Sequence, residues 1–181
     1  MQFVPTTIEG AFEVRLEVHA DERGRFKRNY CEREFADRGL ETTWVQMNHS
    51  ITLGRGSARG FHFQLAPGAE TKLISCSLGR AFDVAVDLRL GSSTFLQWAA
   101  VEIGEDRSFY VPKGCAHGFQ ALEEQVHLVY LHSQYYRPDL ERGVRLDDPT
   151  IGVSWPLPLG KVSDRDLSFK FLGQSFKGLA T

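Results

Sequence analysis

The residues best suited to acid–base chemistry lie in the segment Arg59-Gly-Phe-His-Phe-Gln64, which alternates with the period of a β-strand. On a strand, His62 and Gln64 point to one face, whereas Phe61 and Phe63 point to the other. Histidine can act as a general base near neutral pH, because its unperturbed pKa of about 6.5 leaves most of it neutral. The pattern therefore predicts that His62 faces a site.

Two further polar side chains are placed near His62 by similar patterns. Lys72 alternates with Ile74 and Cys76, neither of which favours solvent, so the lysine is expected to point inward. The spacing Pro-x-Gly-x-x-His, which ends at His117, is typical of small double-sheet barrels. Together these features predict a barrel whose mouth holds the two histidines and the lysine.

Short alternating runs separated by turn signals predict that the chain is mostly β-structure. Only the segment Glu32–Arg38 and the residues after Ser163 look helical, and the stretch from Trp155 is expected to wrap the barrel as irregular chain. The pattern predicts an all-β fold, a double-stranded β-helix or jelly-roll barrel of cupin-like type with short peripheral helices. The expected strands are Phe12–Val18, Phe82–Leu88 with its even-numbered residues on the core side, Phe95–Ile103, Ser108–Val111 and Val126–Leu131.

Composition is that of one globular domain covering residues 1–181. The chain is 42% hydrophobic and has a formal net charge of -2, so no basic surface for nucleic acid is expected. No apolar run approaches the ~20 residues of a membrane span, and the first residues lack the features of a secretory signal. A cytoplasmic location without nucleic-acid or membrane partners is expected. Cys31, Cys76 and Cys115 are far apart and predict buried thiols.

Eight motifs follow one another over nearly the whole chain, and each is weak on its own. In this order they resemble the dTDP-4-dehydrorhamnose 3,5-epimerase family. The resemblance implies a jelly-roll homodimer, free of metal and cofactor, that acts on a nucleotide-sugar substrate. It would epimerise a nucleotide-linked 4-keto-6-deoxyhexose beside its keto group, at C3, C5 or both. The motifs are Asp21-Glu-Arg-Gly24, Val45-Gln-Met-Asn-His-Ser50, Arg59-Gly-Phe-His-Phe-Gln64, Lys72-Leu, Phe82-Asp-Val-Ala-Val-Asp-Leu-Arg89, Pro112-x-Gly-x-Ala-His-Gly-Phe119, Tyr135-Tyr136 and Asp148-Pro-Thr-Ile-Gly152.

Such a reaction needs a base for the proton next to the ketone, a cation or donor for the enolate oxygen, and an acid on the opposite face. The resemblance assigns His62 as the base, Lys72 as the enolate stabiliser and Tyr130 as the acid. If Val126–Leu131 is a strand, Tyr130 shares a face with Leu128 and can point inward.

The resemblance places the partner of the base on Asp166. Its carboxylate would fix the tautomer of the histidine and raise its basicity. Ser163 and Asp166 also form the Ser-x-x-Asp signature of a helix cap, in which the aspartate would satisfy backbone donors. The spacing alone favours the cap and the resemblance favours the dyad. Both hold if Ser163 caps the helix while Asp166 faces the barrel.

Substrate-binding residues are also implied by the resemblance. Arginine suits a diphosphate because its guanidinium binds phosphate oxygens in a bidentate manner. Arg23 and Arg59 match the diphosphate ligands of the family, Tyr136 would stack on the nucleobase, and the segment Arg23–Tyr30 would reach across to a partner's barrel. Further residues implied at the substrate site are Arg28, Gln46, Asn48, His117, Glu141 and Arg165.

Three positions depart from the family around the nucleotide. Arg25 replaces a usual aromatic residue, Arg28 stands where a carboxylate is common, and Met47 replaces an acidic residue. Together they add positive charge, which leaves the identity of the nucleotide open between dTDP, GDP and CDP.

Two other functions fit parts of the same pattern. A metal-dependent cupin enzyme would use His62, Glu70 and His117, but Gln64 occupies the place where a second histidine is usual and is a poor ligand for a transition metal. A non-catalytic protein that binds nucleotide sugars would keep the barrel without turnover, which the retention of a base, an acid and a carboxylate partner disfavours.

Overall fold

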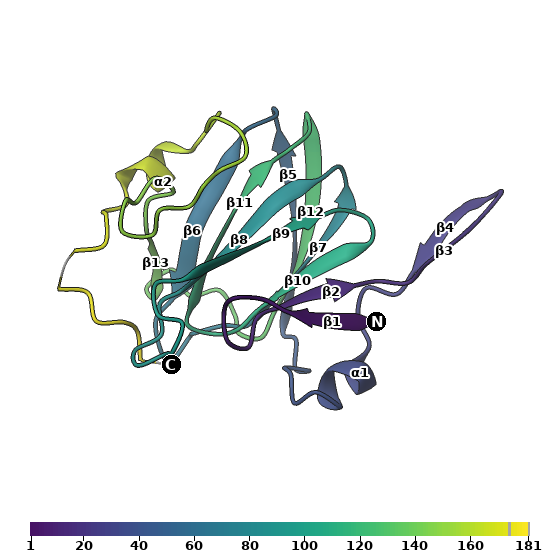
Figure 1. Ribbon diagram of the computed structural model, residues 1–181, viewed down its shortest axis with the longest axis horizontal. Coiled ribbons are helices and arrows are strands. Elements are labelled where there is room, and N and C mark those ends of the chain that lie inside the picture. The colour runs from purple at the N-terminus through teal and green to yellow at the C-terminus, as the bar shows by residue number, and fades with distance from the viewer. Residues whose placement is uncertain (174, 181) are drawn as a thin grey trace.

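Two antiparallel sheets face one another and enclose an apolar core (Figure 1). The computed structural model describes residues 1–173 and 175–180. The prediction of a double-sheet jelly-roll barrel is confirmed. The six-stranded sheet has the order β1 (Gln2–Pro5), β2 (Phe12–Arg15), β10 (Arg107–Val111), β7 (Lys72–Leu78), β12 (Gln125–His132) and β5 (Gln46–Leu53). The five-stranded sheet has the order β13 (Glu141–Gly143), β6 (Ala58–Gln64), β11 (Cys115–Ala121), β8 (Ala81–Asp87) and β9 (Trp98–Ile103).

Four short elements lie outside these sheets. The strands β3 (Val18–Asp21) and β4 (Gly24–Lys27) form a hairpin that projects from the body of the molecule (Figure 1). The helices α1 (Glu32–Ala36) and α2 (Asp164–Ser168) have five residues each, at the two places where helices were expected. No helix among the described residues is long and apolar enough to cross a membrane.

The predicted strand Phe12–Val18 is divided in two, which corrects the expectation from alternation alone. Arg15 ends β2 and pairs with Arg107, where β10 begins, so no strand lies opposite the residues that follow. Leu16 donates its N–H to the carbonyl of Asp106 at 2.8 Å, and the chain then leaves the sheet to form the hairpin.

The strand expected from Phe95 also begins later, at Trp98. The residues before it form a turn in which Leu96 has a φ of 63°, a left-handed conformation that a strand does not use.

Strand β8 is buried on both faces, so its alternation marks two different cores. Val84 and Val86 point outward and pack beneath the C-terminal chain. Ala81 and Ala85 point into the barrel. The face that alternation predicted to be the core side is therefore the outer face of the sheet, and it is apolar because another segment covers it.

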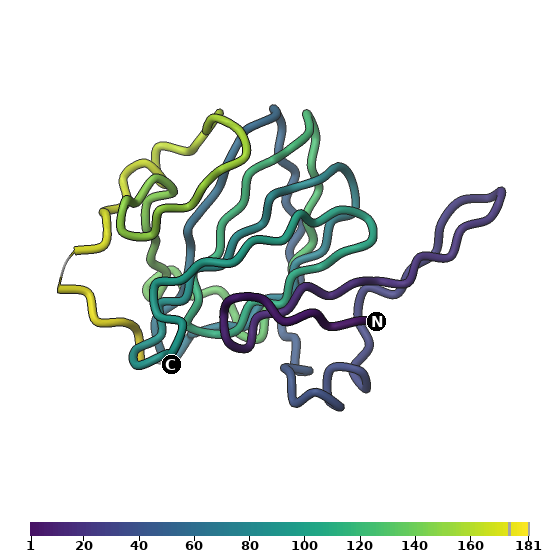
Figure 2. The backbone as a smooth tube through the Cα atoms, in the orientation of Figure 1, coloured from purple at the N-terminus to yellow at the C-terminus, as the bar shows by residue number. Residues whose placement is uncertain are grey.

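The C-terminal chain wraps the five-stranded sheet largely as irregular structure, as expected (Figure 2). Trp155 stacks on Phe61 with 5.8 Å between the ring centroids, and its Nε1–H donates to the carbonyl of Leu146 at 3.0 Å. Gln120 on β11 donates to the carbonyl of Leu157 at 2.9 Å. These contacts hold the segment that leads to α2, which packs against β6.

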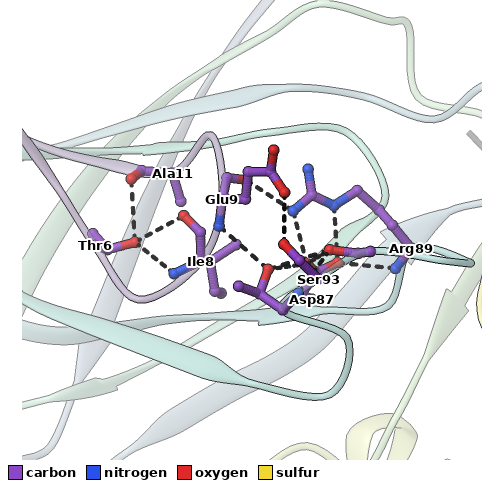
Figure 3. A network of polar contacts seen from close by, with 9 residues as sticks. Thr6, Ile8, Glu9, Ala11, Asp87, Arg89 and Ser93 are labelled. Atoms are coloured by element: carbon purple, nitrogen blue, oxygen red, sulfur yellow. Dashed lines mark hydrogen bonds and ion pairs between the residues drawn. The ribbon is translucent and has the colours of Figure 1, made fainter.

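A buried carboxylate, Asp87, ties the loop after β8 to the turn before β2 (Figure 3). It accepts hydrogen bonds from the Arg89 guanidinium at 2.7 and 2.9 Å and from the hydroxyls of Ser92 and Thr94 at 2.6 Å each. Arg89 also donates to the carbonyl of Glu9 at 2.8 Å. Burial opposes ionisation of Asp87, but these donors outweigh it and lower its pKa to about 2.

Replacing Asp87 by Asn is expected to lower the free energy of unfolding at neutral pH by about 2 kcal/mol. A carboxyl group whose pKa is lower in the folded state than in the unfolded state stabilises the fold when ionised, and the amide cannot ionise. This stabilisation is present above the ordinary carboxyl pKa and is lost as the pH falls through the pKa of the folded protein. The stabilities of parent and variant should therefore converge between about pH 5 and about pH 2. Urea unfolding across this range measures the difference, with Asp106→Asn at an exposed carboxylate as control. A difference that does not change with pH would contradict the assignment.

Candidate active site

A cavity of about 290 Å³ opens between the two sheets. Its walls include β6 and β11 on one side and β5, β7 and β12 on the other, so each sheet supplies one wall. The site residues expected from sequence that line the cavity are Gln46, Asn48, Arg59, His62, Lys72, His117, Tyr130, Tyr136 and Glu141.

His62 on β6 forms a short contact with Asp166 on α2. Its Nε2 lies 2.8 Å from Asp166 Oδ1, and the backbone N–H of Gly60 donates to Asp166 Oδ2 at 3.2 Å. Asp166 is 5% exposed, and this burial raises its pKa. The hydrogen bond and the charge interaction with His62 lower the pKa by more than burial raises it, so the net shift is downward. Asp166 is therefore ionised at neutral pH and accepts the hydrogen of His62 Nε2.

The cap and the pairing with His62 occur together. The backbone N–H of Asp166 donates to Ser163 Oγ at 3.1 Å, which caps α2, while the carboxylate of Asp166 contacts His62. Gly60 has a φ of 121°, and a Cβ there would lie 2.5 Å from the Cα of Gly118 on β11. Glycine at this position therefore allows β6 and β11 to approach closely beside the pair.

Phe169, just beyond α2, packs against the His62 ring. The two rings meet edge to face with 5.7 Å between their centroids. Gly143 on β13 makes room for this, because a Cβ on it would lie 2.2 Å from the Phe169 ring. The imidazole is thus held by a carboxylate and an aromatic ring, both from the C-terminal chain.

The opposite wall carries Lys72, which is 6% exposed. Its Nζ lies 3.2 Å from Oε1 of Glu70 and donates to the carbonyl of His62 at 3.4 Å. The other oxygen of Glu70 lies 2.9 Å from Nδ1 of His132. Burial raises the pKa of Glu70, but Lys72 and His132 together lower it below the usual carboxyl value, so this carboxylate is ionised.

Tyr130 lies next to His132 on β12 and faces the same cavity. Burial raises the pKa of Tyr130 well above its ordinary value, so the phenol keeps its proton at neutral pH and can donate it. Across from it, the ring of His117 lies edge to face at 5.8 Å, and its Nε2 is 2.6 Å from Oδ1 of the buried Asp83. Burial lowers the pKa of His117, which favours the neutral imidazole.

The rim of the cavity is polar. Tyr136 is 52% exposed and donates its hydroxyl to Oε2 of Glu141 at 2.6 Å, and Arg165 forms an ion pair with the same oxygen at 2.5 Å. Gln46 accepts the backbone N–H of Tyr136 at 3.1 Å. Arg59 donates to the hydroxyl of Thr52 at 3.1 Å. The exposed ring of Tyr136 and the guanidinium of Arg59 therefore lie beside the opening of the cavity.

Arg23 and Arg28 do not line the cavity of their own chain. Arg23 lies in the hairpin, has an 84% exposed side chain and pairs with Asp21 at 2.6 Å. Arg28 follows the hairpin and lies 3.6 Å from Glu34 of α1. The physical reason is the projection of the hairpin away from the barrel (Figure 1).

The three residues of the metal-dependent alternative all line the cavity, but each is paired with a different side chain. His62 pairs with Asp166, His117 pairs with Asp83, and Glu70 pairs with Lys72. No group of three or more histidine, cysteine, aspartate or glutamate side chains suited to a metal ion was found among residues 1–173 and 175–180.

Sequence reasoning missed Asp83, His132 and Phe169, and it gave Glu70 a different role. Alternation could have found two of them, because Asp83 faces the barrel interior on β8 and His132 shares the face of Tyr130 on β12. Nothing in the local sequence indicates the contact of Phe169 with His62, since the two are far apart along the chain.

The model of the dTDP-4-dehydrorhamnose 3,5-epimerase family matches residues 5–174. The chain belongs to this family. It is an isomerase. The dTDP-4-dehydrorhamnose 3,5-epimerase of Methanothermobacter thermautotrophicus is 38% identical over 179 residues, which cover 96% of each chain.

Solved structures of the family agree with the fold. A 4-keto-6-deoxy sugar epimerase from the novobiocin gene cluster of Streptomyces spheroides superposes with a TM-score of 0.90 at 36% identity, covering 94% of this chain and 87% of the other. The epimerase of Legionella pneumophila, solved in complex with dTDP-4-keto-L-rhamnose, gives a TM-score of 0.89 at 34% identity, with 94% and 92% covered.

Two substitutions separate the cap of α2 from the contact with His62. Asp166→Asn keeps the backbone bond to Ser163 but removes the charge, so the turnover number of this epimerase should fall by at least about 100-fold. Ser163→Ala should lower the free energy of unfolding by about 1 kcal/mol and leave turnover close to the parent value. Thermal unfolding and initial rates measure both, and the opposite division of effects would show that Asp166 acts only as a cap.

Proposed function

We propose that the enzyme inverts C3, C5 or both in a dTDP-linked 4-keto-6-deoxyhexose, by proton removal on one face of the sugar and proton return on the other. The observation that carries this proposal is the placement of the two proton-transfer groups. His62 lies on the five-stranded sheet and Tyr130 lies on the six-stranded sheet, so a sugar ring between the sheets would meet a base on one face and an acid on the other.

His62 serves as the base in this proposal. Its Nε2–H donates to the ionised Asp166, so the lone pair that can accept a proton is on Nδ1. As the imidazole takes the proton from carbon it becomes positive, and the buried carboxylate at 2.8 Å stabilises that charge.

Lys72 and Tyr130 complete the reaction from the other wall. Loss of the carbon-bound proton moves an electron pair toward the ketone oxygen, and the Lys72 ammonium stabilises the enolate there. The Tyr130 phenol then gives its proton to the carbon from the opposite face, which inverts the centre. Solvent exchange returns one proton to the phenolate and removes one from the imidazolium, so atoms and charge balance over the cycle.

The nucleotide is expected at the polar rim. Arg59 supplies a guanidinium for the diphosphate and the exposed ring of Tyr136 supplies a surface for the base to stack on. A relative from Legionella pneumophila was solved with a dTDP-linked 4-keto sugar, which supports the substrate class. Relatives include both 3,5-epimerases and a 3-epimerase from Streptomyces niveus, so either number of inversions is compatible with this family.

The proposal is tested with dTDP-4-keto-6-deoxyglucose in deuterated water. The parent enzyme should place deuterium at C3, C5 or both, read by proton NMR, and the labelled positions report which centres invert. His62→Asn should slow label uptake by roughly 100- to 10,000-fold, because the amide cannot act as a base.

Tyr130→Phe supplies the complementary result. It keeps the base, so exchange with solvent should continue on the His62 face while net inversion falls by a similar factor. Retention of near-parental inversion in either variant would remove that residue from the mechanism. Absence of label at both carbons with the parent enzyme would overturn the proposed substrate.

We also propose a homodimer in which the hairpin of one chain reaches the cavity of its partner. The hairpin, which projects from the body of the molecule, carries Arg23 and Phe26, and the Phe26 side chain is 71% accessible. The edge strand β5 presents Met47, Ile51 and Leu53 outward, each more than half exposed. A second copy is the occupant that would cover this apolar stripe and accept the hairpin.

The dimer predicts a molar mass near twice that of the 20.4 kDa chain by light scattering at micromolar protein. Ile51→Glu should shift the protein toward the monomer, because the charge would be buried in the interface. Leu90→Glu, at a residue 60% exposed elsewhere, is the matched control and should leave the mass unchanged. A parent protein that is monomeric at this concentration would contradict the proposal.

A further inference from the structure

Lys72 is held by a buried network of its own. Glu70 is the one carboxylate that pairs with Lys72 in the described part of the chain, and the side chains are 9% and 8% exposed. Water therefore screens the pair only weakly, and the carboxylate holds the ammonium group in place.

Glu70 is itself anchored on its second oxygen. His132 Nδ1 lies 2.9 Å from Glu70 Oε2, and Gln64 donates to the same oxygen at 3.4 Å. The other ring nitrogen of His132 lies 3.4 Å from the amide nitrogen of Asn48. Because an amide nitrogen only donates, His132 accepts at Nε2 and donates from Nδ1 to the carboxylate.

The contacts of Glu70 meet two opposing requirements on the partner of Lys72. A buried ammonium group needs a negative partner to keep its charge, yet a carboxylate that bound it too strongly would draw it away from an enolate. The hydrogen bond from His132 engages the second oxygen of Glu70 and fixes the carboxylate against the wall. Lys72 then keeps a counter-charge while its ammonium group stays in the cavity, where it also touches the carbonyl of His62 at 3.4 Å.

We propose that Glu70 and His132 are positioning residues that keep Lys72 cationic and aim it at the ketone oxygen; the catalytic part of this inference rests on the proposed function. Neither Glu70 nor His132 needs to touch the reacting carbon atoms. Among the other titratable or charged groups near Lys72, Tyr130 lies on the neighbouring strand β12. Those across the cavity are His62 and Arg59 on β6, His117 on β11 and the buried Asp83 on β8.

The charge of Lys72 can be tested without any substrate. The probe is potassium cyanate, which carbamoylates neutral amines, and the extent of reaction at Lys72 is read by peptide mass spectrometry at about pH 8. In Glu70→Gln the reaction at Lys72 should be at least about threefold faster than in the parent, because the ammonium has lost its counter-charge. Lys113, an exposed lysine in a loop, is the internal reference and should react equally in both proteins.

A matched variant controls for the loss of any paired glutamate. Glu102→Gln removes a carboxylate that pairs with Arg80 at 2.7 Å on the protein surface, and it should leave both the labelling of Lys72 and turnover unchanged. If Glu70→Gln fails to fold, Glu70→Asp keeps the charge but is too short to hold both contacts. It should give a smaller increase in labelling in the same direction.

Kinetics give the second measurement. Glu70→Gln should lower kcat by roughly 10- to 100-fold with a KM within about twofold of the parent, as expected for a charge needed mainly when the enolate forms. His132→Phe should lower kcat less. The double variant should be no slower than Glu70→Gln alone, since both changes act through Lys72.

The outcomes separate this inference from the proposed function. Parental labelling of Lys72 in folded Glu70→Gln, or in Glu70→Asp where that variant is the one that folds, would overturn the inference even if the parent enzyme is an active epimerase. Faster labelling in a protein whose parent exchanges no proton of dTDP-4-keto-6-deoxyglucose would support the effect of Glu70 on Lys72 and reject the proposed function. Faster labelling with unchanged kcat would confine Glu70 to structural support and overturn the positioning role.

Discussion

Burial of charge between the two sheets is the constraint on which the rest of the site depends. A charged side chain that leaves water is costly unless it is paired and hydrogen-bonded, and the wall positions here lie at the edge of an apolar barrel core. Three ionisable side chains on the walls accordingly have a carboxylate partner within hydrogen-bond distance. His62 has Asp166, His117 has Asp83, and Lys72 has Glu70. Their orientation is fixed by pairing before any ligand enters, which is the preorganisation that proton transfer requires.

The carboxylate beside His62 depends on the most distant part of the chain. Asp166 is 104 residues from the histidine in sequence, and it reaches β6 only because the C-terminal chain wraps the outer face of the same sheet. Phe61 and Phe63, the neighbours of His62 on that strand, point outward into the apolar cluster beneath this chain. One strand thus uses its outer residues to hold the C-terminal segment and its inner residue to receive the carboxylate.

Alternation in the sequence predicted which side chains share a face, but it does not predict their partners. It placed Lys72 and Tyr130 inward, and the structure puts both on the cavity wall. It could not choose between a cap and a dyad for Asp166, because the choice depends on whether α2 packs against β6. It also misjudged β8, since a strand covered on its outer face by a later segment has no solvent side. The double-sheet fold was predictable from local periodicity, whereas the pairs within the site arise from contacts between distant segments.

The number of positively charged side chains at the cavity links substrate binding to the proposed dimer. A nucleoside diphosphate brings at least two negative charges, yet Arg59 is the one arginine found among the described residues that line the cavity. Arg165 is already paired with Glu141 at the rim, and Lys72 is paired with Glu70 deeper inside. Arg23 and Arg25 of the projecting hairpin do not line the cavity of their own chain, and they pair with the exposed carboxylates of Asp21 and Glu105. A second copy that offers its hairpin would bring these guanidinium groups to the cavity, where phosphate oxygens would replace their exposed carboxylate partners. In the proposed dimer the groups that move protons therefore come from one chain, and part of the phosphate binding comes from the other.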